Sequence, residues 1–259
     1  MAAKRQDDLF VRSLAKGLQV IEAFGEEKSS HTLSDIARAT GLTRATARRL
    51  LHTLVRLGYA EHEDKRFSLS PRVLNLGYSY LTSLGLWNLA EPFMEDLVSV
   101  VKESCSASVL DGFDVVYVAR VPTRARIMSI TLNIGTRLPC HATSMGRVLL
   151  AGLPEDQLEH FLGGLPLEAY TDHTVTDPDE LREIVGKVRR QGWALVDQEL
   201  ELGLRSVAVP LLDRTMRVFA AVNVSAHTSR ASVKDIKSSI LPELQKCARL
   251  INRAYGGSR

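Results

Sequence analysis

The sequence predicts an α+β protein with two domains joined by a helical linker. The chain has 259 residues, more than a single core usually organises when a helical start is followed by a mixed remainder. Apolar residues recur at helical spacing through residues 12–57, whereas strand-like and helical patterns alternate after residue 105. These observations place the first domain at residues 1–70, the linker at 71–104 and the second domain at 105–259.

The composition is typical of a soluble globular protein, with 45% hydrophobic and 24% charged residues. No apolar run approaches the roughly 20 residues that span a membrane, and the charged N-terminus lacks the apolar centre of a signal peptide. A cytoplasmic protein is therefore expected. Cys105, Cys140 and Cys247 are odd in number and far apart, which favours neither a disulfide framework nor a zinc site. No metal or cofactor is expected.

The first helix is expected over residues 12–24. Leu14, Leu18 and Ile21 recur at helical spacing and predict one buried stripe. Gly25 and the polar residues after it end the helix.

Two further helices are expected within residues 33–58, joined by a tight turn. Thr32 stands three residues before Asp35, an acidic variant of the capping box that begins a helix. Gly41 supplies the turn, and Thr43 is placed to cap the third helix.

The third helix has two different faces when its residues are plotted at about 100° per residue. The apolar side is expected to pack on the other helices and consists of Ala47, Leu50, Leu51, Leu54 and Leu57. The opposite side is polar and basic and consists of Ala45, Arg48, Arg49, His52 and Arg56, with Arg44 on its flank.

Excess positive charge is confined to the first domain. Residues 1–70 hold 12 Lys and Arg against 9 Asp and Glu, and the remainder holds 21 of each. A charge run alone is usually a solvated helix face. A nucleic-acid partner would need the same positive field.

A two-stranded hairpin is expected after Gly58, with its turn at residues 63–66. Three helices, a glycine turn and a basic hairpin at this spacing are typical of a winged helix-turn-helix, which favours DNA binding. Arg44 and Arg48 are placed for base edges. Thr43, Thr46 and Arg49 suit phosphates, and His52 completes the DNA-facing side of the helix. On the wing, Lys65 and Arg66 are expected to touch backbone phosphate or the neighbouring minor groove.

The linker is expected to contain two helices, beginning at Pro71 and at Pro92, because proline is favoured at the first helical position. Helices between domains commonly carry a dimer contact, and dimers of DNA-binding proteins pair two half-sites. Alternatively, Tyr78, Tyr80 and Trp87 cover the core of the second domain. The two interpretations are compatible.

The second domain is expected to be a mostly antiparallel sheet with helices packed around it. A hairpin is predicted over residues 106–121 with its turn at Asp111–Gly112, followed by strands at 126–134, 193–197, 206–212 and 217–226. Helices are expected from about Thr143, over 155–162 and 178–191, and from Ser232 to the C-terminus.

Four blocks of this sequence, in this order, resemble the IclR family of bacterial transcriptional regulators over essentially the whole chain. They are LSDIARATGLTRATARRLLHTLVRLGY, LPCHATSMGRVLLAGLP, RRQGWALVDQELELGLRSVAVPL and VNVSAHTSR. The second block is most similar to regulators of the protocatechuate branch of the β-ketoadipate pathway. The chain departs from the family pattern at Thr43, where proline is usual, and at Ala45, where serine is usual.

The resemblance implies a GAF-like second domain that binds a small carboxylic acid of the β-ketoadipate or protocatechuate class. It also implies a homodimer or tetramer on a palindromic operator. Effector binding is then expected to change either the DNA-competent population of dimers or their contact with RNA polymerase, and no membrane association is expected. The effector-binding residues that it implies are Ala142, Thr143, Ser144, Met145, Gly146, Asp197, Glu199, Ser206, Asn223 and Ser225.

The chemistry of the middle block agrees with an anion site. A helix beginning near Thr143 presents free backbone N–H groups and the positive end of its dipole, and Ser144 adds a hydroxyl. Ser144 is equally suited to capping the helix. Arg126 and Arg137 are candidate partners for a carboxylate.

The acidic and strand residues of the set also have structural alternatives. Asp197 is as well suited to pairing with Arg205 as to contacting a ligand, and Asp197 or Glu199 could hold an arginine in place. Asn223 and Ser225 alternate with valines, so strand register decides whether they point into the domain.

An enzyme is the alternative from a different class. The segment ATSMG at 142–146 resembles the nucleophile turn of α/β-hydrolases, and Ser144, Asp197 and His227 follow that fold's order. The turn requires an apolar parallel strand before it, but residues 137–141 read RLPCH. A hydrolase is therefore disfavoured.

Overall fold

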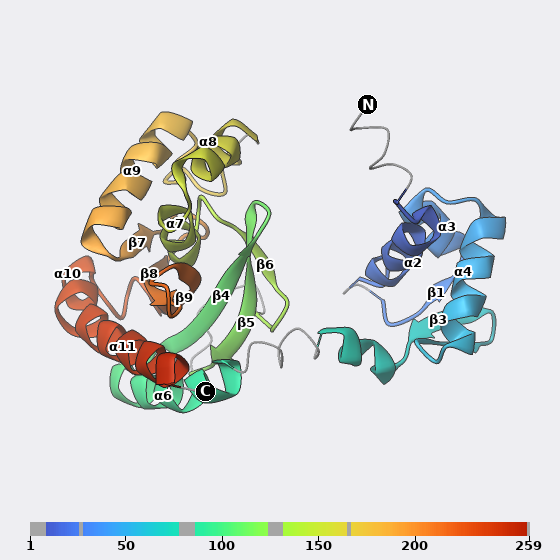
Figure 1. The fold of residues 1–259 in the computed structure, drawn as a ribbon, viewed down its shortest axis with the longest axis horizontal. Coiled ribbons are helices and arrows are strands. Elements are labelled where there is room, and N and C mark those ends of the chain that lie inside the picture. The colour runs from blue at the N-terminus through green and yellow to red at the C-terminus, as the bar shows by residue number, and fades with distance from the viewer. Residues whose placement is uncertain (1–8, 26–27, 78–85, 124–131, 165–166, 258–259) are drawn as a thin grey trace. The chain divides into compact units, whose positions relative to one another are not determined.

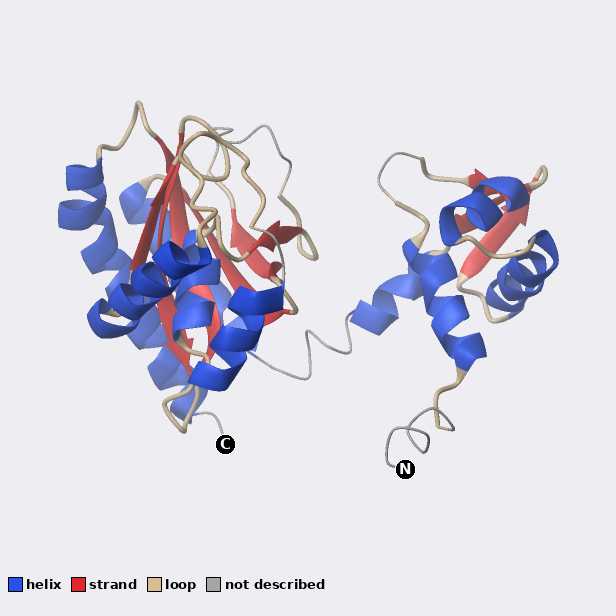
Figure 2. Ribbon diagram, turned by 90° about the horizontal axis from the view of Figure 1, so that it is seen from above, coloured by secondary structure: helices blue, strands red, loops and turns tan. Residues whose placement is uncertain are grey.

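The computed structural model describes residues 9–25, 28–77, 86–123, 132–164 and 167–257. The chain divides into two compact units, Met1–Ser83 and Leu84–Arg259. Figures 1 and 2 show a smaller N-terminal unit of helices with a short sheet and a larger unit built on a six-stranded sheet. The predicted α+β class with a helix-turn-helix start is confirmed.

The N-terminal unit contains the three predicted helices, α2 (Arg12–Glu22), α3 (Leu33–Thr40) and α4 (Arg44–Arg56). The Thr32–Asp35 capping box is present, and Gly41 ends α3 in the left-handed conformation with φ of 66°. The hydroxyl of Thr43 accepts from the backbone N–H of Thr46 and begins α4.

The wing follows α4 as strands β2 (Ala60–Glu63) and β3 (Arg66–Leu69), and β1 (His31–Thr32) pairs with β3 to complete a small antiparallel sheet. Asp64 and Lys65 form the turn with φ values of 46° and 67°. Two successive positive φ values are the signature of the two-residue turn that matches strand twist in hairpins.

The expected buried stripe on the first helix was wrong for Leu14 and Leu18, which are exposed. Ile21 packs against the core, and Val20 is the fully buried residue of α2. Leu57, expected on the packed face of α4, is also exposed. Helical spacing gives the width of an apolar face but not the part of it that the neighbouring helices cover. Here the leucines border a groove between α2 and α4.

The linker differs from expectation at its second helix. Ser70 caps a short 3₁₀ turn, η1 (Pro71–Val73), as the sequence predicted for a start at Pro71. The next helix, α6 (Leu86–Val101), contains Pro92 in its interior, so the predicted start at that proline was wrong. Tyr78 and Tyr80 lie outside the described residues, and Trp87 is buried.

The C-terminal unit is built on an antiparallel sheet in the order β6-β5-β4-β9-β8-β7. Its strands are β4 (Ser104–Asp111), β5 (Asp114–Val121), β6 (Arg137–Pro139), β7 (Ala194–Asp197), β8 (Leu204–Leu212) and β9 (Val218–His227). The first hairpin turns at residues 112–113, because Asp111 pairs with Asp114. Of the strand predicted at 126–134, residues 126–131 lie outside the described residues, and 132–134 form no strand.

Helices cover both faces of this sheet. On one face lie α7 (Ser144–Ala151), α8 (Glu155–Gly164) and α9 (Pro178–Gln191), and on the other lie α6 and the C-terminal helix. The C-terminal helix runs through α10 (Val233–Asp235), a π-helical turn η2 (Ile236–Ile240) and α11 (Leu241–Gly257). Asp177 caps α9 and Gly192 ends it, as the sequence predicted.

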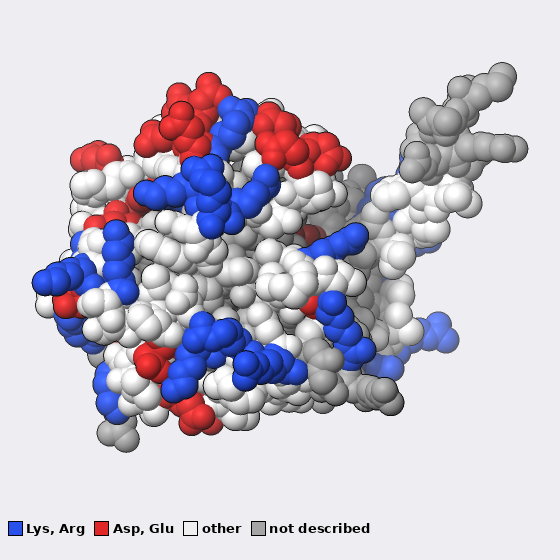
Figure 3. All heavy atoms as spheres, turned by 60° about the vertical axis from the view of Figure 1, so that its left-hand side comes forward, with Lys and Arg blue, Asp and Glu red and all other residues white. Residues whose placement is uncertain are grey.

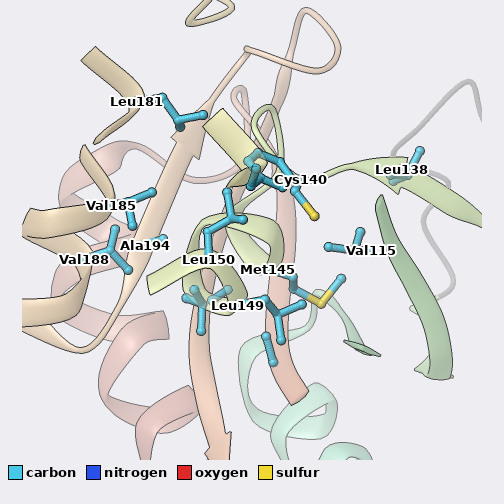
Figure 4. Packing of buried hydrophobic residues seen from close by; sticks show 14 of the residues in the cluster. Val115, Leu138, Cys140, Met145, Leu149, Leu150, Leu181, Val185, Val188 and Ala194 are labelled. Carbon is cyan, nitrogen blue, oxygen red and sulfur yellow. The ribbon is translucent and has the colours of Figure 1, made fainter. Parts of the chain in front are cut away.

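The largest core cluster of the second unit is centred on α7. Figure 4 shows Met145, Leu149 and Leu150 between the side chains of α9 and those of β5 and β6. All but the last residue of α7 are buried, so the start of this helix is held rigidly against the sheet.

On the face drawn in Figure 3, acidic and basic side chains lie next to one another, in line with the equal numbers of both after residue 70. None of the described helices is long and apolar enough to cross a bilayer. Cys105, Cys140 and Cys247 are buried free thiols.

Candidate functional site

The first candidate site is the exposed basic side of α4. Arg44, Arg48, Arg49 and His52 are exposed, and within the described part of the chain none of the three arginines forms an ion pair. A row of exposed cations without carboxylate partners keeps its full field for a negatively charged partner.

The predicted contact residues on α4 lie in different surroundings. Thr46 and Arg49 border the groove between α2 and α4. His52 faces the wing, where its ring centroid lies 5.9 Å from that of His62 and 6.0 Å from that of Phe67. Thr43 is occupied as the helix cap.

The two predicted residues of the wing have different roles. Lys65 is exposed in the turn. Arg66 bonds Ser30 twice, from Nε to the hydroxyl at 2.9 Å and from Nη2 to the carbonyl oxygen at 2.7 Å. Arg66 therefore holds the residue that precedes β1 in place. The side chain of Lys65 remains exposed to solvent.

The second candidate site is a small cavity between α7 and one face of the large sheet. It is lined by Tyr117, Ala142, Thr143, Ser144, Val196, Leu200, Leu204, Ser206, Asn223 and Ser225. Its volume is about 20 Å³, little more than the roughly 10–15 Å³ that one water molecule requires. The polar lining residues come from the start of α7, from β8 and from β9.

Six of the ten predicted effector residues line this cavity: Ala142, Thr143, Ser144, Ser206, Asn223 and Ser225. Their strand members come together because Ser206 pairs with Ser225 across β8 and β9. Strand register therefore turns the polar side of β9 towards α7.

Met145 and Gly146 do not line the cavity. The sulfur of Met145 accepts from the Ser108 hydroxyl at 3.2 Å within the core. Gly146 lies against the backbone of Cys140, where a Cβ atom would come within 2.2 Å of the carbonyl oxygen. Gly146 therefore allows the close approach of two backbone segments and not that of a ligand.

Asp197 and Glu199 also lie outside the lining, because each carboxylate holds an arginine. Arg205 donates from Nε and Nη2 to the two oxygens of Asp197, both at 2.8 Å. Arg147 donates to both oxygens of Glu199, at 2.7 and 2.5 Å. Of the alternatives left open by the sequence, the structure selects the ion pair for Asp197.

Two buried polar atoms at the cavity have no partner among the described residues. They are the hydroxyl oxygen of Ser144 and the amide oxygen of Asn223. Ser144 is 1% exposed and Asn223 4% exposed. Thr143 is the cap of α7, so the Ser144 hydroxyl is not used for capping. Buried polar groups are nearly always hydrogen-bonded, so both atoms are free to bond a molecule in the cavity, whether water or ligand.

Sequence reasoning missed four residues of the lining, Tyr117, Val196, Leu200 and Leu204. Tyr117, Val196 and Leu204 carried no signal beyond an apolar strand pattern, and Leu200 lies in the loop between β7 and β8. Burial raises the pKa of Tyr117 to about 12. Of the two arginines suggested as carboxylate partners, Arg126 lies outside the described residues.

Arg137, the other suggested arginine, is engaged elsewhere. It pairs with Asp111 at 2.6 Å and with Asp114 at 3.1 Å on the exposed edge of the sheet. The hydrogen bond to Asp111 is the main cause of the raised pKa of this guanidinium.

The hydrolase alternative is not supported by the geometry. Asp197 is bound to Arg205, and His227 contacts Ser229 through Nδ1 at 2.8 Å. Ser144 has no hydrogen-bond partner among the described residues. The three residues of the proposed triad are therefore not linked to one another.

A winged helix-turn-helix with an unpaired basic helix, followed by a unit that encloses a polar cavity, defines a DNA-binding regulator with a small-molecule sensor. Residues 13–64 match the IclR helix-turn-helix domain, and residues 78–253 match the C-terminal domain of the bacterial transcriptional regulator IclR. The chain belongs to the IclR family of bacterial transcriptional regulators, as the sequence resemblance indicated.

Known proteins resemble the chain over nearly its whole length. The Pca regulon regulatory protein of Pseudomonas putida is 43% identical over 251 residues, which cover 96% of this chain and 86% of that protein. A crystal structure of a regulator from Rhodococcus sp. RHA1 has a TM-score of 0.84 and 51% identity, covering 95% of this chain and 98% of that one. An IclR homologue of Microbacterium hydrocarbonoxydans complexed with 4-hydroxybenzoate has a TM-score of 0.83 and 28% identity, covering 94% and 98%.

Proposed function

We propose that this protein is an effector-responsive regulator of an aromatic-acid catabolic operon of the protocatechuate and β-ketoadipate type. The observation that carries the proposal is the pair of unpartnered buried atoms at the cavity, on Ser144 and Asn223. The similarity to the Pca regulon regulatory protein supports the class of operon. The 4-hydroxybenzoate complex of a relative supports an aromatic acid as the type of effector.

In this proposal α4 enters the major groove of operator DNA. Arg44 and Arg48 read base edges, since arginine bonds guanine with two parallel hydrogen bonds. The residues that fix the helix on phosphates or support it there are Thr43, Thr46, Arg49 and His52, with Lys65 and Arg66 on the wing. Because Thr43 caps α4 and Arg66 holds Ser30, these two act mainly by placing the others.

We propose a homodimer, or a tetramer made of two dimers, that binds a palindromic operator. A single recognition helix reads few base pairs, and a dimer pairs two half-sites about one helical turn apart. The groove between α2 and α4 leaves Leu14, Leu18 and Leu57 exposed in one chain, which supports coverage by a second copy. The protein would act in the cytoplasm, where its operator lies.

The effector is proposed to bind between α7 and the sheet. At the start of α7, Ser144 offers a hydroxyl and the helix offers the positive end of its dipole. Asn223 offers an unused carbonyl oxygen, which accepts from a ligand hydroxyl. A hydroxylated acid satisfies both atoms, whereas a purely apolar ligand satisfies neither.

Binding must enlarge the cavity, because an aromatic ring is several times larger than the single water that the cavity now admits. A ligand that binds one conformation better than another shifts the population towards it. We propose that the expanded form changes how the dimer presents its α4 helices to DNA, or how it contacts RNA polymerase.

The proposal is tested by footprinting the DNA upstream of the protein's own gene, with and without protocatechuate, 4-hydroxybenzoate and β-ketoadipate. A palindromic footprint that changes with one of the acids is expected. Calorimetric titration of the same acids into the protein measures binding directly. An unchanged footprint together with no heat of binding would contradict the assignment to this group of regulators.

A further inference from the structure

A row of polar side chains continues from the cavity across the sheet to β5. Ser106 on β4 stands opposite Asn223 on β9 and opposite Arg120 on β5. Residues directly opposite on antiparallel strands have side chains on the same face and in contact range. Asn223 lines the cavity. Ser106 and Arg120 therefore lie on the cavity face of the sheet, one and two strands away from Asn223, beyond the residues that line the cavity.

An irregularity in β5 puts Arg120 on the cavity side. Ser108 pairs with Tyr117 and Ala107 with Ala119, which leaves Val118 as an extra residue. A bulge of this kind re-aims side chains because two residues of one strand oppose one of the other. Tyr117, which lines the cavity, and Arg120 are three residues apart, and the extra residue places them on the same face. Without it they would point to opposite faces.

The charge of Arg120 is not balanced within the described residues. The side chain is half-buried, and its guanidinium donates from Nη1 to the hydroxyl of Ser106 over a long 3.4 Å. It forms no ion pair with a described acid. Burial lowers the pKa of Arg120, and the nearby Tyr117 opposes that effect.

Two buried arginines of this unit, unlike Arg120, are each paired with a carboxylate. Arg147 and Arg205 each share both oxygens of a carboxylate. Buried charges are normally paired, because taking an unpaired charge out of water is costly. A half-buried guanidinium beside the cavity that has only a weak hydroxyl contact is therefore suited to an anion that arrives from outside.

We propose that Arg120 binds a carboxylate of the effector, at the end of the ligand opposite to Ser144, so that an acid with a single carboxylate turns its hydroxyl groups to Ser144 and the start of α7. This inference rests on the proposed function, because it assigns a role within the same cavity. About two strand spacings, roughly 10 Å, separate the backbones of Arg120 and Asn223, which suits a six-membered ring or short chain with oxygen groups at both ends. Arg120 would then select acids over the corresponding uncharged phenols.

The test compares ligands with and without the carboxylate. Calorimetry on the full-length protein measures the affinity for protocatechuate, 4-hydroxybenzoate, β-ketoadipate and catechol, which has the two hydroxyls of protocatechuate but no acid. The variants are Arg120→Ala, Arg120→Gln and Arg120→Lys, with Arg137→Ala as a control that removes an arginine from a neighbouring strand outside the cavity.

For the acid that the wild-type protein binds, Arg120→Ala and Arg120→Gln are expected to weaken binding about 10- to 100-fold, since hydrogen bonds to charged groups are the strong ones. Arg120→Lys should recover part of the loss and Arg137→Ala should bind as wild type. Catechol should bind wild type and Arg120→Ala equally. Two neutral variants are used so that a folding defect in one leaves the other to be measured.

The outcomes separate the two proposals. Acid binding that survives Arg120→Ala and Arg120→Gln overturns the role of Arg120 and leaves the proposed function standing. An equal loss of catechol and acid affinity also overturns it, because the residue would then support the cavity in general. If the wild-type protein binds none of the acids, the proposed function fails, and this inference fails with it.

Discussion

Arg147 and Glu199 form a buried bidentate ion pair that joins α7 to the loop after β7. Nη1 of Arg147 lies 2.7 Å from Oε1 of Glu199, and the two side chains are 3% and 10% exposed. Nε of Arg147 also donates to the carbonyl oxygen of His141 at 3.0 Å. The hydroxyl of Thr174 donates to the carbonyl oxygen of Glu199. The loop that carries Leu200 over the cavity is thus tied to the same helix that carries Ser144.

The first prediction concerns this pair. Glu199→Gln and Arg147→Met each leave one buried charge uncompensated, and each should lower the free energy of unfolding of the second unit by about 3–5 kcal/mol. The exposed pair between Arg182 and Glu159 is the control, since Arg182→Ala should cost about 1 kcal/mol or less. Urea unfolding followed by circular dichroism measures both. Equal losses in the free energy of unfolding would mean that the buried pair does not stabilise the unit more than an exposed pair does.

The second prediction concerns Gly146. A methyl group there would meet the backbone of Cys140, with the carbonyl oxygen at 2.2 Å and the Cα at 2.3 Å. Because backbone cannot swing aside as a side chain does, Gly146→Ala should destabilise the unit by at least the roughly 1–3 kcal/mol typical of overpacking. Gly163→Ala, where no atom lies within 4 Å of the new methyl, should have no such effect. Thermal unfolding of the two variants provides the comparison, and equal melting temperatures would contradict the close approach.

The third prediction separates stability from ligand binding at Ser144. Ser144→Ala removes a buried hydroxyl that has no protein partner among the described residues, so the free energy of unfolding should be unchanged or higher by up to about 1–3 kcal/mol. Effector affinity should nevertheless fall, because the ligand loses a hydrogen bond. Thr143→Ala, which removes the cap of α7, should cost about 1 kcal/mol of stability. A Ser144→Ala protein that is less stable and binds the acid normally would reverse this assignment.

The fourth prediction concerns DNA. Arg48 is exposed on α4 and free of ion pairs with described acids, and Arg48→Ala should weaken operator binding by about 1–3 kcal/mol and relax one base preference. Lys65→Ala on the wing should weaken binding to all sequences alike. It should also reduce the slope of log affinity against log salt concentration by about one. Fluorescence titration at several salt concentrations distinguishes the two. Operator affinity that does not respond to Arg48→Ala would mean that this side chain faces away from the bases.

Sequence reasoning was most successful where structure depends on neighbouring residues in the chain. The Thr32–Asp35 box, the left-handed turn at Gly41, and Thr43 as the cap of α4 were all predicted and are present. Capping and turn formation involve residues within about four positions of one another. The same holds for Asp177 and Gly192 at the two ends of α9.

Predictions that required knowledge of packing partners were less successful. The apolar spacing of α2 gave a helix but not its buried side, since Val20 is covered and Leu14 is exposed. Pro92 gave a helix start by local rules, yet it lies inside α6. In both cases contacts with distant segments, which a local pattern does not contain, decide the result.

The sequence by itself determined the class of this protein: a basic helix-turn-helix, a mixed second domain, and polar residues grouped around Ser144. Only the tertiary structure decided which of those polar residues enclose the cavity. Strand pairing places Ser206, Asn223 and Ser225 on the side of the sheet that faces α7. Glu199 is bound to Arg147 and does not line the cavity. One extra residue in β5 places Arg120 on the same face. The physical reason is that a shift of one residue in strand register moves each side chain to the opposite face of the sheet. That register is set by pairing with the neighbouring strands.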